Sequence, residues 1–385
     1  MHVIALKMLF GDKGKYLGIV VAIALSSLIM IQQPAMLADI LSQTYGAISD
    51  MNLPDIWVMD PKVQSVDFSE PIQDTQLYRV RGVSGVEWAV PFFKGGQKVR
   101  LINGETTQCL MYGLDEATLI GGPTAMIEGR LADLRIPDTV IVDEAGAKGR
   151  LAIHSADGSV TPVKVGDILE INDKRAQVVG IARATPSFMS QPIIFTTYPR
   201  AEHFAFSERK LLSFVLAKAK PGERPEDVSR RITAETGLAA YSSEEFQKIS
   251  LHHIVNDTNI LVNIGFVVVI GFVVGTAVTG QMFHNFTQDN LRYFGVFKAM
   301  GATNSTLVRM VMLQALLAGF VGFGLGAGLS AGFMAASAEG IGPHPKMTWQ
   351  LLAASGGAVL LIVTLAALIS VRRVLKLEPA EVFKA

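Results

Sequence analysis

The histidines two thirds of the way along the chain are the residues best placed for metal chemistry. His252, His253 and Asp257 lie in one polar segment, and the spacing of His253 and Asp257 puts both side chains on one face of a helix. Imidazole and carboxylate groups are common metal ligands. A single His-Asp pair on a polar helix is more typical of a solvated surface, so we expect no metal site and no catalytic residues.

The sequence lacks the usual phosphate-binding motif of ATPases. The stretches GDKGKY at 11–16 and GGQKVR at 95–100 have neither the spacing nor the Ser or Thr of a G-x-x-x-x-G-K-[ST] loop, which cradles phosphate and magnesium. The chain is therefore not expected to hydrolyse ATP by itself. It is expected to bind no cofactor, and any ATP and magnesium would be held by a separate ATPase.

Long apolar runs dominate the composition. Half of the 385 residues are hydrophobic and only 18% are charged, which is typical of a membrane protein. Four runs contain no Asp, Glu, Lys or Arg and are long enough to cross a bilayer: 16–38, 258–288, 310–338 and 347–371. The first run could instead be the core of a cleaved signal peptide, but it ends in QQPAMLAD without an A-x-A site. Four spanning helices are predicted.

Lys and Arg near the ends of these runs predict the orientation. Those on one face are Lys7, Lys13, Lys15, Arg292, Lys298, Arg309, Arg372, Arg373, Lys376 and Lys384, against Lys346 on the opposite short loop. Both termini are therefore expected in the cytoplasm and the segment between the first two spans outside it. Cys109 is the only cysteine, so that segment has no internal disulfide. A net charge of zero gives no support for nucleic-acid binding.

The segment between the first two spans predicts a folded α/β domain. DIWVMD at 55–60 and EWAVPFF at 87–93 are strand-like and flank a short helical stretch, and LLSFVLAKA at 211–219 and LAAYSS at 238–243 do the same. Two such β-α-β units predict a split module with a β-rich insertion at about 97–200 between them. SEEFQKISLHHIVNDTNILVN at 243–263 contains no Gly or Pro and predicts a stalk helix that continues unbroken into the second span.

The only loop expected between spans on the cytoplasmic side contains a short amphipathic helix. Tyr293, Val296, Phe297 and Met300 recur at i, i+3, i+4 and i+7. Gly301 is expected to stop this helix, and Thr303 or Asn304 to begin the next. Pattern alone favours a helix that rests on lipid headgroups.

Small and polar residues in the spans suggest further contacts. Close packing of helices, either within one subunit or in a dimer, is expected from glycines at spacing four: Gly271, Gly275, Gly324, Gly328 and Gly332. Candidates for the mouth of a central cavity are Gln32, Gln33, Asn259 and Asn263, which could equally lie in the headgroup zone. Gln314, deeper in the third span, is expected to make an interhelical hydrogen bond.

Three stretches resemble the FtsX-like permease family, the MacB-type membrane subunits of ABC transporters. They are LRYFGVFKAMGAT at 291–303, VLKLEPAEVFKA at 374–385 and LKMLFGDKGKYLGI at 6–19, the last most similar to the stand-alone DevC-like branch. The resemblance covers nearly the whole chain. It implies an α+β membrane protein with four spans and a large extracytoplasmic MacB-like domain between spans one and two. The segments expected are 1–15 (cytoplasmic), 16–38 (span one), 39–257 (domain), 258–283 (span two), 284–306 (cytoplasmic loop), 307–336 (span three), 337–348 (outer loop), 349–371 (span four) and 372–385 (cytoplasmic tail).

The resemblance also assigns the short helix of the cytoplasmic loop. In the family the corresponding helix docks into a groove of the ATPase, and this implies coupling residues Arg292, Tyr293, Phe294, Gly295, Val296, Phe297, Lys298, Ala299, Met300, Gly301 and Ala302. Relatives often have an acidic residue where this chain has Tyr293, so an ion pair made by that acid is in doubt here. The partners implied are two ATPase subunits, a second copy of this chain and membrane lipid. A periplasmic adaptor and an outer-membrane channel are suggested more weakly.

The function expected is that of a permease in an inner-membrane exporter. A separate ATPase would drive it by mechanotransmission, and a hydrophobic or amphipathic substrate would be extracted on the outer side. The alternative is an FtsX-like signalling scaffold, which controls an extracytoplasmic partner without transport. The substrate cannot be inferred from the sequence.

Overall fold

The computed structural model describes residues 2–51, 53–154, 159–187, 191–205, 211–338, 345 and 347–376. The chain divides into two compact units. One holds Ile40–Asn259, and the other holds the described residues up to Asp39 and from Ile260 onward. The expected fold class is confirmed: four helices are long and apolar enough to cross a membrane, and an α/β domain lies between the first and second of them in the sequence.

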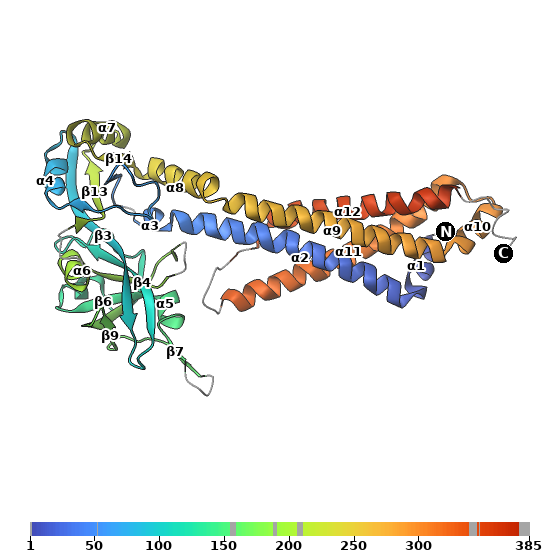
Figure 1. Ribbon diagram of the computed structural model, residues 1–385, viewed down its shortest axis with the longest axis horizontal. Helices are drawn as coiled ribbons and strands as arrows, with labels where there is room; N and C mark the ends of the chain where they lie inside the picture. Colours follow the sequence, from blue (N-terminus) through green and yellow to red (C-terminus); the bar gives the residue numbers. More distant parts are fainter. Residues whose placement is uncertain are drawn as a thin grey trace. The chain divides into compact units, whose positions relative to one another are not determined.

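The membrane unit consists of long helices that lie side by side (Figure 1). Their bounds are α1 (His2–Gly11), α2 (Lys13–Thr44), α9 (Ile260–Asp289), α10 (Leu291–Ala299), α11 (Asn304–Ala338) and α12 (Trp349–Lys376). The candidate spans are α2, α9, residues Asn304–Ser337 of α11 and residues Trp349–Arg372 of α12. These helices extend past the predicted spans, because an apolar run marks the hydrocarbon core, whereas a helix can continue through polar residues beyond it.

One of these differences concerns the loop expected at 284–306. Helix α9 continues to Asp289, so the helical connection is shorter than predicted. No Gly or Pro interrupts residues 281–289, and two polar pairs brace this turn at a spacing of four. The amide of Gln281 donates to Asn285 Oδ1 at 3.1 Å, and Gln288 Nε2 lies 2.9 Å from a ring nitrogen of His284. The predicted outer loop 337–348 and the tail 372–385 lie largely outside the described residues.

A proline in α2 is accommodated by a partner on another span. Pro34 lies inside the helix and has no N–H to donate to the carbonyl of Met30, four residues earlier. Ser355 of α12 donates its hydroxyl to that carbonyl at 2.9 Å, and the contact is buried. In hydrocarbon a backbone carbonyl that has lost its helical hydrogen bond needs such a donor, because no water is available to donate instead.

Ser355→Ala is therefore expected to destabilise the membrane unit by about 1–2 kcal/mol, because it leaves the Met30 carbonyl unpaired. Pro34→Ala restores the backbone donor, so in that background the same Ser355→Ala change should cost less than half as much. Unfolding of the four single and double variants in mixed micelles measures the coupling. Equal costs in both backgrounds would contradict the assignment.

The domain is built on a ten-stranded sheet of order β14-β1-β13-β3-β4-β11-β6-β10-β5, in which β9 pairs with both β10 and β3. The strands are β1 (Ile56–Met59), β2 (Ile72–Gln73), β3 (Val86–Arg100), β4 (Thr106–Leu114), β5 (Ala125–Glu128), β6 (Thr139–Asp143), β7 (Ile153–His154), β8 (Val160–Thr161), β9 (Ile168–Ile171), β10 (Lys174–Arg183), β11 (Ile193–Thr197), β12 (Leu211–Leu212), β13 (Phe214–Ala219) and β14 (Ala239–Ser242). The domain helices are α3 (Gly46–Ser49), α4 (Thr75–Gly82), the 3₁₀ turn η1 (Leu131–Arg135), α5 (Glu144–Lys148), α6 (Tyr198–Phe204), α7 (Pro225–Thr236) and α8 (Ser243–Asp257).

Both predicted β-α-β units are present and share one part of this sheet. β1 pairs with β13 and β14, and β13 pairs with β3. Apolar residues of α4 and α7 pack on one face, and Phe246 of α8 packs with Trp57 on the other. Strand β3 pairs with β13 through its first half and with β4 through its second half, so the insertion begins within a strand.

A buried ion pair lies in this domain. The ammonium of Lys94 donates to Asp67 Oδ1 and to the carbonyl of Val66, each at 2.6 Å, and the Lys94 side chain is 2% exposed. Burial lowers the pKa of Lys94, and the charge of Asp67 opposes that shift. The pair connects β3 to the segment after β1. Nothing in the local sequence, where Lys94 follows Phe93 and precedes Gly95, predicts this distant partner.

The predicted stalk helix is interrupted. Helix α8 ends at Asp257 and α9 begins at Ile260. Between them Asn259 has φ 56°, in the left-handed region that Asn tolerates better than most residues, and the Thr258 hydroxyl donates back to the Ile254 carbonyl. The prediction of a continuous helix was wrong because it considered only Gly and Pro as breaks.

Candidate functional site

Helix α10 is a short rigid element between two candidate spans. The Asn290 carbonyl accepts from the backbone N–H of Tyr293 at 3.1 Å and of Phe294 at 3.2 Å at its start. At its end Gly301 has φ 93°, its N–H donates to the Lys298 carbonyl, and the N–H of Ala302 donates to the Phe297 carbonyl. This pair of bonds is a Schellman motif, which requires a left-handed residue and favours glycine. Thr303 then accepts from the Thr306 N–H as α11 begins.

One side of α10 is buried in the helical core. Phe294 is fully buried among residues that include Phe283 and Phe286 of α9 and Leu307 of α11, and Gly295 beside it is also buried. Leu291, Phe297 and Ala302 are half-buried against the same core. The sequence pattern had placed Phe297 on the outward stripe. The recurrence of Leu291, Phe294 and Phe297 at every third position is the signal for the inward face.

The other side of α10 is open. Tyr293 is 58% exposed and Met300 is 70% exposed, with Arg292 and Ala299 also exposed and Val296 half-buried between them. Arg292 has no ion-pair partner among the described residues. We call Arg292, Tyr293, Val296, Ala299 and Met300 the outer face of α10. It combines two large apolar side chains with a cation, a composition suited to a protein groove.

Lys298 links α10 to another span. Its ammonium donates to the Leu375 carbonyl at 3.1 Å, in the last turn of α12. A cation at a helix C-terminus satisfies a carbonyl that has no partner inside the helix, and it interacts favourably with the helix dipole. The family resemblance implied a coupling role for Lys298, which stays a prediction, and the structure adds this contact within the chain.

The start of α2 is tied to the end of α9 just before α10. Lys15 forms ion pairs with Asp12 at 2.8 Å and with Asp289, the last residue of α9. Gln314 of α11 donates to the Ala5 carbonyl of α1 at 2.7 Å, so its predicted interhelical bond is made to the N-terminal helix. These contacts join α2 to α9 and α1 to α11.

The predicted packing glycines divide into two groups. A Cβ at Gly271 would lie 2.9 Å from Ile29, and one at Gly275 would lie 2.2 Å from the hydroxyl oxygen of Ser26, so both pack closely on α2. Around Gly324, Gly328 and Gly332 an added Cβ would meet nothing within 4 Å. The structure therefore contradicts the expectation that these three glycines pack closely within the chain. Their place in a dimer contact stays a prediction.

The glycines that pack α11 on α2 are the neighbours of the predicted set. A Cβ at Gly322 would lie 2.7 Å from Ile23, and one at Gly326 would lie 2.5 Å from the Ala24 carbonyl oxygen. Of the candidate cavity residues, Gln32 and Gln33 are half-buried, Asn263 is exposed, and Asn259 forms the break between α8 and α9. Their place at a cavity mouth stays a prediction.

The histidine segment does not assemble a metal centre in the described part of the chain, where no group of three metal-binding side chains occurs. His253 lies 2.8 Å from Asp257, and His252 lies 2.9 Å from Asn256, each pair one turn apart on α8.

Two family models match the chain. The FtsX-like permease C-terminal model matches residues 246–379, and the MacB-like periplasmic core domain model matches residues 16–235. The second match covers more than half of the chain. The chain therefore belongs to the FtsX-like and MacB-type family of ABC transporter permeases, and it is a multi-pass membrane protein of that class.

Curated relatives agree with this class. An uncharacterized ABC transporter permease of Mycobacterium tuberculosis is 24% identical over 322 residues, which cover 82% of this chain and 80% of the relative. An uncharacterized ABC transporter permease of Methanocaldococcus jannaschii is 24% identical over 173 residues, which cover 43% of each chain.

Solved structures of related domains are only distantly similar. The extracellular domain of the noncanonic ABC-type transporter YknZ from Gram-positive bacteria matches 50% of this chain and 99% of that domain, with 13% identity and a TM-score of 0.34. The periplasmic region of MacB from Actinobacillus actinomycetemcomitans matches 52% of this chain and 94% of that region, with 11% identity and a TM-score of 0.38. At these scores the structural matches carry no argument of their own.

Proposed function

We propose that a separate ATPase drives this permease by binding to the outer face of α10. The observation that carries the proposal is the division of this nine-residue helix into a fully buried side at Phe294 and an open side at Tyr293 and Met300. An element fixed on one side can transmit a force applied to the other, because it cannot rotate in place. ATP and magnesium would bind to the ATPase.

The force would reach the spans through contacts within the chain. Phe294 packs against α9 and α11, and Lys298 is bonded to the end of α12, so displacement of α10 would move three helices together. At the far end of α9, Asn259 separates the span from α8. In the proposed mechanotransmission, movement of α9 would therefore reach the domain through the helix break at residues 258–259.

The assembly would contain two copies of this chain and two ATPase subunits, with both termini in the cytoplasm. A periplasmic adaptor and an outer-membrane channel would complete it in an export function. The substrate class proposed is hydrophobic or amphipathic, because the spans offer few charges to a polar solute.

The test is to purify the full chain with the ATPase of its neighbouring reading frame and to measure ATP turnover in lipid nanodiscs. We expect stable association and turnover that a hydrophobic amphiphile stimulates severalfold. Stimulation only by a soluble extracytoplasmic hydrolase would instead support a signalling scaffold. Failure of the two proteins to associate would refute the proposed coupling.

A further inference from the structure

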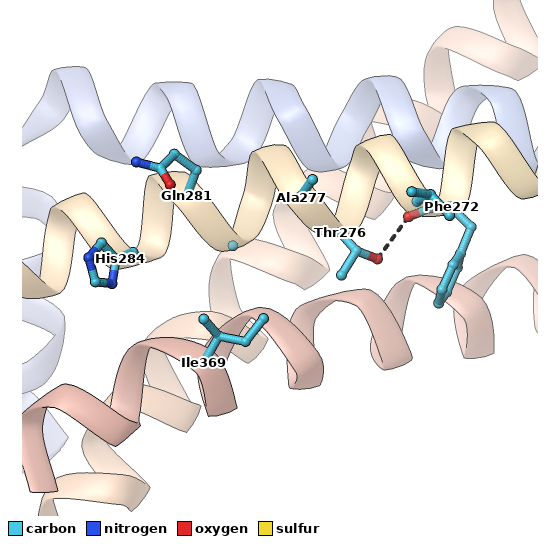
Figure 2. Close-up of a pocket in the computed structure, with 8 residues that line it drawn as sticks. Phe272, Thr276, Ala277, Gln281, His284 and Ile369 are labelled. Carbon is cyan, nitrogen blue, oxygen red and sulfur yellow. Dashed lines mark hydrogen bonds between the residues drawn. The ribbon is translucent and has the colours of Figure 1, made fainter.

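A groove of about 540 Å³ lies along α9 where α12 packs beside it. Its described lining consists of one face of α9, from Phe272 to His284, together with Ile369 of α12. Figure 2 shows Phe272 and Thr276 directed toward α12 and Ile369 directed toward α9, while Gln281 lies on the opposite rim. A groove of this volume is in the range of small-molecule sites.

The polarity of the groove changes along its length. One end is formed by Phe272 and Val273, and the Thr276 hydroxyl next to them is satisfied by the Phe272 carbonyl at 2.7 Å. The other end is formed by Gln281 and His284. The lining therefore offers one apolar end and one polar end, which is what an amphiphile requires.

The position of the groove along α9 matches one leaflet of a bilayer. Phe272 is 12 residues from the start of α9 at Ile260 and His284 is 24 residues from it, or about 18 and 36 Å at 1.5 Å per residue. A hydrocarbon core of about 30 Å places Phe272 near the bilayer centre and His284 at the headgroups of the leaflet farther from Ile260. The groove therefore spans one leaflet.

An arginine follows the part of α12 that lines the groove. An added Cβ at Gly275 would lie 3.5 Å from Ile362 and one at Gly280 would lie 3.9 Å from Ile369, so α9 and α12 run side by side in the same direction. Arg372, three residues beyond Ile369, therefore lies on the same face of α12 at the level of His284. Arg372 is exposed and has no partner among the described residues, and no described lining residue is acidic.

We propose that this groove binds an anionic phospholipid of the leaflet farther from the domain. One acyl chain occupies the apolar end beside Phe272, and the phosphate lies between His284 and Arg372. The site does not involve the outer face of α10, so it stands or falls independently of ATPase coupling.

The experiment is native mass spectrometry of the full chain in detergent with added dioleoylphosphatidylglycerol or dioleoylphosphatidylcholine. We expect the wild type to retain the anionic lipid with about fivefold preference, the effect of one cation at a membrane surface. Arg372→Gln should remove the preference. Lys13→Gln, which changes another exposed cation at the membrane surface, should keep it.

A second pair of variants tests occupancy of the groove. Gly280→Leu fills the groove and should reduce retention of both lipids at least fivefold, whereas Gly265→Leu, on the same helix but with open space around it, should not. The proposal fails if Arg372→Gln leaves the lipid preference unchanged. Because Arg372 is exposed, this substitution removes a charge without disturbing helix packing. The proposal also fails if Gly280→Leu converts a dimer to a monomer without changing lipid retention, because a second copy would then occupy the groove.

Discussion

Met300→Asp is expected to release the partner ATPase while the permease stays folded. Met300 is 70% exposed at the end of α10, so the charge is solvated in the free chain and becomes unpaired only when an apolar groove covers it. Loss of a hot-spot residue costs about 2 kcal/mol or more, so affinity should fall at least about 30-fold if Met300 is one. Binding of the ATPase to the permease in nanodiscs, followed by its ATP turnover, measures this.

Control substitutions distinguish a loss of ATPase binding from a loss of folding. Tyr293→Asp, on the same outer face, should have a similar effect. Ile102→Asp puts the same charge on a side chain that is 71% exposed in the domain, and it should leave ATPase binding unchanged. Lys298→Glu is a poorer probe, because Lys298 also bonds to the end of α12. Wild-type binding by both α10 variants would show that the ATPase does not dock on this face.

Gly326→Val is expected to cause the largest loss of stability in the membrane unit. A Cβ at this position would lie 2.5 Å from the Ala24 carbonyl oxygen and 2.6 Å from the Cβ of Ser27, so α2 and α11 must separate. Forced overpacking costs about 1–3 kcal/mol or more, and separation here also disturbs the backbone of α2. Unfolding of the detergent-solubilised chain on titration with a denaturing detergent should show the loss.

Gly328→Val is the matched control. It lies two residues later on the same helix, where an added Cβ meets nothing within 4 Å, and its effect on unfolding should stay within about 0.5 kcal/mol. If Gly328→Val lowers stability as much as Gly326→Val, close packing of Gly326 on α2 is not the cause of the loss. If it instead weakens self-association of the folded chain, the predicted dimer contact of this glycine row gains support.

The sequence alone was sufficient for features that depend on local pattern. Four apolar runs predicted four candidate spans, because only a helix of about 20 apolar residues satisfies its backbone across a bilayer. Paired strand and helix patterns predicted an α/β domain between the first two spans. The helix break at Gly301 could also be predicted, since a left-handed residue there needs glycine.

Features that depend on a partner distant in sequence could not be predicted in this way. Helical periodicity placed Gly324 and Gly328 on one stripe and Gly322 and Gly326 on another, but only the packed structure shows which stripe meets α2. Likewise, the break at Asn259 depends on a left-handed backbone conformation. Asn tolerates this conformation but also occurs in ordinary helices, so its presence alone does not predict a break.

Apolar runs, strand and helix patterns and the family motifs were enough to predict a four-span permease with a domain between its first two spans. The folded structure was needed to show that Phe294 faces inward, that Ser355 donates to the carbonyl freed by Pro34, and that a groove lies between α9 and α12. The physical reason is that periodicity fixes how side chains are arranged around one helix, whereas the choice of buried face is made by the neighbours that cover it.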